Sequence, residues 1–326
     1  MFYRLQSAVT LPGPVGGWDY LAFDPARNYL FLDRRAQGVT VYDVDSRKVV
    51  AQIANSTGAN STAFAPDLNL GFTSNGDGST TIFRLSSLKT IKRVRFGKSA
   101  DAGFYEPTTR QMLFAMGDDH AVAFLDARTG KLVSVLQTKS RKLEAAVADG
   151  HGKLFMNERD RNSVLRIDPL RHVVTAEWPV VGCDEPTGIA YDAADARLFI
   201  GCRGDHPVLS VMNAKTGAVV TTIPIGRGND SVIYDPSERQ IYTSNGIDAN
   251  IVAIKQLDAD RYALAEATTT RPEARTMAFD PKSKRIFVVT AQGAVDPARK
   301  IDTAVSPFYP NRYFRGTYTI LTYARR

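Results

Sequence analysis

Short apolar segments separated by polar turns recur along the whole chain at a nearly constant spacing. Asp24, which ends the apolar segment of residues 20–24, marks one position of this repeat. Equivalent positions lie at Ala65, Glu106, Asp149, Asp192, Asp235 and Asp280, with separations of 41, 41, 43, 43, 43 and 45 residues. Repeats of this length, each able to form four short strands, are typical of the blades of a β-propeller.

Each repeat shows the same order of predicted strands. A first strand of small and apolar residues, such as 187–191, leads through a polar turn to a second strand with a Leu-Phe pair, such as Leu198 and Phe199. A third, alternating strand, such as 122–126, enters a tight turn of the form Asp-x-x-Thr-Gly, in which Asp bonds backbone groups and Gly accepts a positive φ. The pattern predicts an all-β fold, in which residues 1–326 form a single seven-bladed β-propeller domain with four-stranded antiparallel blades.

The ends of the chain indicate how this propeller closes. The seventh repeat ends with its third strand at residues 318–323, whereas a spare strand at residues 2–10 precedes the first repeat. An unpaired strand edge invites association with other chains. We therefore predict that the N-terminal strand completes the last blade.

The repeat motifs resemble a known family. The segment Glu185-Pro-Thr-Gly-Ile-Ala-Tyr-Asp192, the Leu-Phe strand and the turn Asp126-Ala-Arg-Thr-Gly130 look like the YVTN repeat. Nearly the whole chain resembles the YncE-like seven-bladed propellers, a WD40-like architecture. The resemblance implies a bacterial, often exported protein, and it implies little about activity because such propellers host unrelated functions. No secretory signal and no apolar run of about 18 residues is visible, so we expect a soluble protein, periplasmic or secreted if a signal was removed and otherwise cytoplasmic.

A ring of polar residues is predicted where the first strands begin. These residues lie five positions before each repeat marker and are Asp19, Asn60, Asp101, Glu144, Thr187, Asp230 and Arg275. Because first strands line the central channel of a propeller, we expect the ring at the channel mouth, where it would bind a ligand. Oxygen ligands suit Ca²⁺ or Mg²⁺, so Asp101, Glu144 and Asp230 are candidate ligands of a divalent cation.

The ring has an alternative interpretation as a solvated channel mouth with local ion pairs. A regular hairpin places Arg34 opposite Asp19 and Arg159 opposite Glu144, so that these arginines belong to the candidate ligand site. The same count leaves Asp101 and Asp230 without an assigned cation.

Histidine and cysteine residues offer a second, less favoured metal site. His120 and His206 lie in loops that open on the same face, and a transition metal such as Zn²⁺ would prefer their imidazoles and Cys202 to carboxylates. Cys183 and Cys202 are the only cysteines. They either form a disulfide, which would imply an oxidising compartment, or stay free thiols. A regular ladder places Cys202 opposite Thr187 and does not bring the sulfurs together, which favours free thiols.

The seventh repeat carries a long insertion at residues 291–316. Loops of this length in compact domains are usually functional or disordered, and its aromatic content argues against disorder. The aromatic and basic residues are Phe308, Tyr309, Arg312, Tyr313, Phe314 and Arg315. We expect the insertion to lie over the channel mouth as a lid or a plug, where Tyr309, Arg312 and Tyr313 would contact a bound base or anion.

Composition and motifs narrow the function only to a class. The net charge is +7, but the basic residues are scattered along the chain and form no single basic patch in the sequence. A nucleic-acid-binding scaffold is therefore the least favoured interpretation. No common catalytic or phosphate-binding motif is present, so no catalytic residue is assigned and enzymatic activity is left open. We predict a monomeric propeller that binds a small molecule, a divalent cation or a peptide segment at the channel mouth. The alternative is a divalent-metal-assisted hydrolase or lyase that uses the same site.

Overall fold

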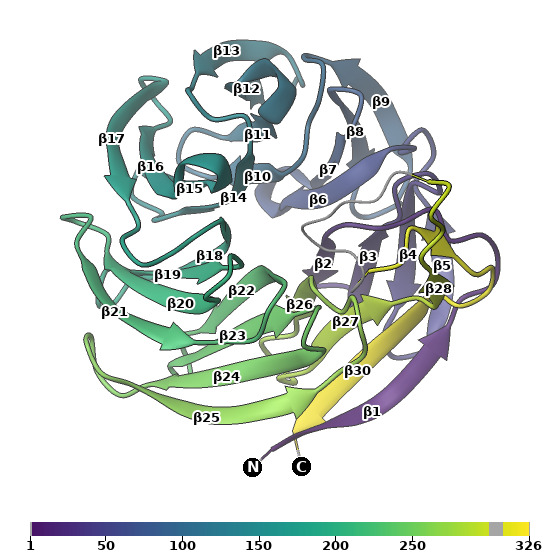
Figure 1. The fold of residues 1–326 in the computed structure, drawn as a ribbon. Helices are drawn as coiled ribbons and strands as arrows, with labels where there is room; N and C mark the ends of the chain where they lie inside the picture. The colour runs from purple at the N-terminus through teal and green to yellow at the C-terminus, as the bar shows by residue number, and fades with distance from the viewer. Residues whose placement is uncertain (1, 300–308, 326) are drawn as a thin grey trace. The chain divides into compact units, whose positions relative to one another are not determined.

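The protein folds as predicted into seven four-stranded antiparallel β-sheets, the blades of a β-propeller (Figure 1). The computed structural model describes residues 2–299 and 309–325. Phe308 and the rest of residues 300–308 of the predicted insertion therefore lie outside the described residues. The chain divides into two compact units: unit 1 contains Met1–Gly17 and Gly182–Arg326, and unit 2 contains Trp18–Val181.

Unit 2 contains blades one to four, each with its strands in sequence order. Blade one consists of β2 (Leu21–Asp24), β3 (Tyr29–Asp33), β4 (Val39–Asp43) and β5 (Lys48–Gln52), and blade two of β6 (Ala59–Ala65), β7 (Leu70–Asn75), β8 (Ser79–Arg84) and β9 (Thr90–Arg95). Blade three consists of β10 (Gly103–Glu106), β11 (Gln111–Met116), β12 (Ala121–Asp126) and β13 (Leu132–Gln137), and blade four of β14 (Leu143–Ala148), β15 (Leu154–Glu158), β16 (Ser163–Asp168) and β17 (Val173–Pro179). Three short 3-10 turns are η1 (Pro66–Leu68), η2 (Gly117–Asp119) and η3 (Arg159–Arg161).

Unit 1 contains blades five to seven. Blade five consists of β18 (Pro186–Asp192), β19 (Arg197–Cys202), β20 (Val208–Asn213) and β21 (Val219–Pro224), and blade six of β22 (Asn229–Asp235), β23 (Gln240–Asn245), β24 (Asn250–Gln256) and β25 (Tyr262–Thr269). Blade seven has the order β1-β30-β27-β26 and consists of β1 (Tyr3–Thr10), β30 (Thr319–Arg325), β27 (Ile286–Thr290) and β26 (Met277–Phe279). The insertion adds a small ribbon of β28 (Gly293–Ala294) and β29 (Arg312–Tyr313).

The predicted closure of blade seven by the N-terminal strand is confirmed. β1 runs antiparallel to β30, from Tyr3 opposite Arg325 to Thr10 opposite Thr319, and the two strands lie side by side in Figure 1. The buried Tyr3 hydroxyl donates to the Lys284 carbonyl at 2.8 Å and lies 3.1 Å from the Tyr242 hydroxyl. The first strand is therefore tied both to its own blade and to blade six.

The recurrent Leu-Phe signature is explained by the cores between neighbouring blades of each unit. In unit 1, Phe199 of blade five is fully buried and packs with Val232 and Ile241 of blade six. In unit 2, Phe31 of blade one packs with Phe83 of blade two. An aromatic side chain at this position buries a large apolar area, which is the main source of folding free energy.

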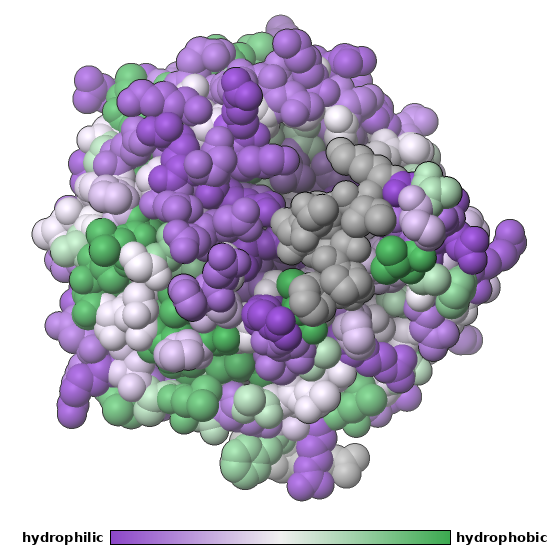
Figure 2. Space-filling model, in the orientation of Figure 1, coloured by the Kyte–Doolittle hydropathy of each residue, from purple (hydrophilic) through white to green (hydrophobic). Residues whose placement is uncertain are grey.

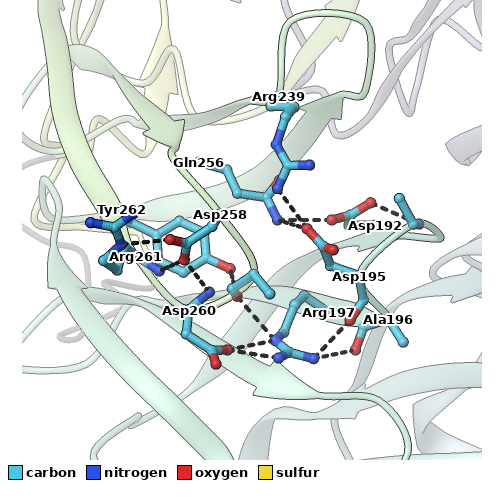
Figure 3. Close-up of polar contacts among 12 residues, drawn as sticks. Asp192, Asp195, Ala196, Arg197, Arg239, Gln256, Asp258, Asp260, Arg261 and Tyr262 are labelled. Carbon is cyan, nitrogen blue, oxygen red and sulfur yellow. Dashed lines mark hydrogen bonds and ion pairs between the residues drawn. The ribbon is translucent and has the colours of Figure 1, made fainter.

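The repeat markers join neighbouring blades through polar contacts. In unit 1, the turn after Asp192 contacts β24 and two turns of blade six (Figure 3). Gln256 donates to the Asp192 carboxylate at 2.8 Å, and Arg239 forms an ion pair with Asp195 at 2.6 Å. Arg197 bonds the Asp260 carboxylate at 2.6 Å and the Ala259 carbonyl at 3.1 Å. The polar turn seen in the sequence is thus a structural clamp between blades.

Replacing Arg197 with alanine is expected to lower the free energy of unfolding by about 2 kcal/mol. The side chain is only 11% exposed and its guanidinium holds several partners that would lose their hydrogen bonds. Urea unfolding would measure the change. Arg261→Ala is the matched control, because Arg261 is 75% exposed and its ion pair with Asp258 is a surface pair worth less than about 1 kcal/mol. Equal losses in the two variants would contradict the clamp.

The face of the molecule drawn in Figure 2 is mixed in character. Over β18–β25 in unit 1, hydrophobic and hydrophilic residues alternate in small areas, whereas the side of unit 2 over β10–β17 is mostly hydrophilic (Figure 2). Among the residues that the structure describes, no helix is long and apolar enough to cross a membrane.

Candidate functional site

Four of the seven predicted ring positions lie at irregularities of the first strands. The pairing between first and second strand shifts within Ala59–Ser61, Leu143–Ala146, Pro186–Ile189 and Asn229–Ser231, which are the segments that hold Asn60, Glu144, Thr187 and Asp230. A β-bulge inserts an extra residue and redirects its side chain. The strand pairing around these four positions therefore departs from that of a regular hairpin.

In unit 2, the ring members lie in local contacts. Asp19 forms an ion pair with Arg35 at 2.7 Å, one residue beyond the predicted Arg34, which is itself buried. Glu144 pairs with Arg159 at 3.5 Å, as predicted. The Asn60 side chain donates to a backbone carbonyl at 3.0 Å.

Asp101 and His120 occupy blade three of the same unit. The Asp101 N–H donates to the Ala115 carbonyl at 2.9 Å, and its own carbonyl accepts from the Ser74 hydroxyl at 2.6 Å. His120 follows η2 with a φ of 52°, in the loop between β11 and β12. These bonds fix the backbone at the start of the blade.

In unit 1, Asp230 is held between two arginines, so the expectation that it has no cation partner is wrong. Its carboxylate lies 2.9 Å from Arg203 Nη1 and 3.0 Å from Arg275 Nε. Arg203 also approaches Glu185 at 3.8 Å. The hairpin count missed Arg203 because it compares strands of one blade, whereas Arg203 follows β19 of blade five. Both arginines occupy the Asp230 carboxylate, which is unfavourable for binding a cation at this position.

Tyr309 of the insertion packs on this arginine cluster. The Arg275 guanidinium lies 5.8 Å from the centre of the Tyr309 ring, a cation–π arrangement. A Cβ atom at Gly246 would lie 2.5 Å from the Tyr309 hydroxyl, and one at Gly228 would lie 2.8 Å from it, so only glycine admits the ring here. Burial raises the pKa of Tyr309 far above its ordinary value.

Glu273 and Tyr313 make a second attachment of the insertion. The Tyr313 hydroxyl donates to Glu273 Oε1 at 2.9 Å, and Glu273 is 1% exposed. Its other oxygen, Oε2, has no hydrogen-bond partner among the described residues. Burial raises the pKa of Glu273 to about 7, and the nearby Arg275 partly offsets this rise. No sequence pattern marks Glu273, because only its contact with the insertion distinguishes it from other glutamates.

A pocket of about 510 Å³ lies at the root of the insertion. Its walls include Arg271 and Pro272 from the connection into blade seven, Gly293 to Val295 and Pro310 from the insertion, and Thr317 just before β30. This volume is within the range of small-molecule sites, and the lining combines apolar and hydrogen-bonding groups. Arg271 makes no ion pair with any residue that the structure describes.

Cys183 and Cys202 form a disulfide, so the prediction of free thiols is wrong. Their Cα atoms are 5.3 Å apart, within the range for this bond. The bulge in β18 explains the error, since Cys202 lies opposite Pro186 and not Thr187. A disulfide-bonded Cys202 offers no thiolate to a metal.

No metal centre is apparent in the described part of the chain. Residues 2–299 and 309–325 contain no group of three or more His, Cys, Asp or Glu side chains placed to hold an ion. The structure therefore does not bring the candidate ligands Asp101, Glu144, Asp230, His120 and His206 into such a group.

Comparisons with known proteins support the fold alone. No family model matches the sequence, and no curated protein matches it. The structure is similar to the crystal structure of RRP9 WD40 repeats, with a TM-score of 0.78 and 10% identity over 98% of this chain and 99% of that chain. It is also similar to a chain of a mitotic checkpoint complex, with a TM-score of 0.75 and 17% identity over 87% of this chain and 88% of that chain. A chain of Kuenenia stuttgartiensis hydrazine synthase gives a TM-score of 0.72 and 15% identity over 87% of this chain and 95% of that chain. The chain is thus a seven-bladed propeller similar to WD40 propellers.

Proposed function

We propose that this protein is a binding propeller whose ligand is a small molecule or peptide segment with a carboxylate or phosphate group. The observation that carries the proposal is the pocket of about 510 Å³ beside the insertion, with Arg271 among the residues of its wall. Arginine binds carboxylate and phosphate oxygens through paired N–H groups. The apolar walls from Pro272, Val295 and Pro310 would accept the body of the ligand.

The predicted site residues of unit 1 would then position the insertion. Asp230 and Arg275 provide the surface on which Tyr309 packs, and Tyr313 bonds Glu273. Arg312 lies in β29, 3.9 Å from Asp296 within the insertion. The ring members of unit 2 stay predicted ligand contacts, and nothing in their geometry favours one ligand over another.

The Arg271→Gln variant tests the proposal. A calorimetric screen of the wild-type protein against mono- and dicarboxylates, phosphate monoesters and short peptides with free carboxyl termini should find a binder. Arg271→Gln should weaken that binding about tenfold, as expected for loss of one charge-assisted contact. Arg261→Gln, an exposed arginine of the same unit, is the matched control and should bind like the wild type. A panel without any binder, or equal affinity in Arg271→Gln, would refute this function.

The resemblance to YncE-like propellers and the exported location stay predictions. The disulfide supports an oxidising compartment, since such bonds persist in secreted and periplasmic proteins. The metal-assisted hydrolase or lyase has no supporting observation among the described residues. A rise in melting temperature on addition of Ca²⁺, Mg²⁺, Mn²⁺ or Zn²⁺ would support the metal-assisted enzyme.

A further inference from the structure

Glu273 connects the proposed ligand pocket to the arginine cluster. It follows Arg271 and Pro272, which line the pocket, and precedes Arg275 by two residues. Its φ of 66° is in the left-handed region, which is uncommon for a residue with a side chain. The Glu273 N–H donates to the Gly246 carbonyl at 2.9 Å, and its carbonyl accepts from the Arg275 N–H at 2.7 Å. The backbone therefore holds the carboxyl group in one place.

The insertion contacts Glu273 through Tyr313, which lies in the segment that returns to β30. We define the insertion stem as residues 291–297 and 309–316, whose two arms are paired by β28 and β29. Tyr313 in this stem donates to one Glu273 oxygen, and the other oxygen is buried without a partner among the described residues. A neutral carboxyl group tolerates such a position, whereas an ionised one loses hydration that the protein does not replace.

We propose that Glu273 is a pH-dependent latch, which holds the insertion stem closed when protonated and favours its displacement when ionised. The proposal rests on the proposed function in one respect only: the stem forms a wall of the pocket, so its displacement would regulate ligand access.

The direction of the pH dependence follows from the different proton affinities of Glu273 in the closed and displaced states of the stem. With the stem closed, burial raises the pKa of Glu273 to about 7. With the stem displaced, water reaches the carboxyl group and its pKa returns toward the ordinary value of 4.5. The closed stem therefore binds the proton more tightly, and opening becomes more favourable as the pH rises from 4.5 to 7. Above pH 7 both forms are ionised and the effect is constant.

Neighbouring charges modify this response without reversing it. Arg275 lies near Glu273 and favours its ionised form in the closed state, as does the hydrogen bond from Tyr313. Asp230, which is paired with both Arg203 and Arg275, offsets part of their charge. Burial still outweighs the attraction to Arg275, so the pKa of Glu273 stays raised.

Hydrogen exchange without ligand tests the latch. The probes are the Phe314 N–H, which donates to the Gln292 carbonyl at 2.8 Å, and the Asp296 N–H, which donates to the Asn311 side chain at 2.7 Å. After division by the intrinsic rates, the opening constant should rise roughly 70-fold from pH 5 to pH 8, if the pKa values are those of the two states. In Glu273→Gln the opening constant should be flat. Glu238→Gln, which removes a carboxylate in the β22–β23 turn, should keep the wild-type response.

A second variant separates the latch from general loosening. Tyr313→Phe should raise the opening constant at every pH and keep its pH dependence, because Glu273 stays buried. A pH-independent opening constant in the wild type, or an unchanged slope in Glu273→Gln, would overturn the latch. Because these measurements contain no ligand, the latch can hold while Arg271→Gln refutes the pocket, and the pocket can hold while the latch fails.

Discussion

Deleting residues 1–11 is expected to lower the free energy of unfolding by at least about 5 kcal/mol, the largest effect of any change considered. The deletion removes the β1–β30 ladder, in which each backbone hydrogen bond contributes about 1 kcal/mol. It also removes the buried Tyr3 and Leu11 side chains, each of which stabilises the fold by about 2 kcal/mol. The buried Tyr242 hydroxyl would lose its contact with Tyr3.

Urea unfolding followed by circular dichroism measures this loss, and a synthetic peptide of residues 2–11 added in trans gives a specific check. If β1 acts by completing blade seven, the peptide should restore most of the lost stability in proportion to its concentration. The double variant Arg4→Ser, Gln6→Ser is the control, since both side chains are exposed and the strand itself is kept. An unchanged melting temperature after deletion would refute the closure.

The fold could be predicted from the sequence because its signals are local and repeated. Each blade needs the same alternation, the same Leu-Phe pair and the same turn residues, so seven copies reinforce one interpretation. The closure by β1 followed from counting strands in the seventh repeat. Asp192 and its equivalents also marked a real feature, although their role as clamps between blades became visible only with the contacts of Gln256 and Arg239.

The contacts of the site were less predictable because β-bulges shift pairing by one residue. A bulge has no clear sequence signature in this chain, yet it places Cys202 opposite Pro186 instead of Thr187. Asp230 meets Arg203 of blade five, and a count within one hairpin does not include a neighbouring blade. Glu273 gave no signal at all, since its burial depends on an insertion that packs against it from 40 residues further along the chain. Ion pairs that depend on register or on insertions therefore need three-dimensional information.

Replacing both cysteines with alanine is the second large expected effect. In the chain-entropy description, a disulfide that closes a loop with a sequence separation of 19 stabilises the folded state by about 3 kcal/mol. Alanine is the appropriate replacement because both side chains are almost fully buried, where a serine hydroxyl would need a partner. The double variant should lose about 3 kcal/mol in urea unfolding.

Single variants distinguish the bond from ordinary packing. If the disulfide is responsible, Cys183→Ala alone should lose nearly as much as the double variant, because either change removes the same bond. Two losses that add would instead indicate two independently packed thiols. Alkylation of the unfolded, unreduced wild-type protein should modify no cysteine, and mass spectrometry would detect any that is modified. Arg203 directly follows Cys202, and its partner Glu185 lies two residues after Cys183. Loss of the bond should therefore also loosen Arg203, and with it the Asp230 pair on which the insertion depends.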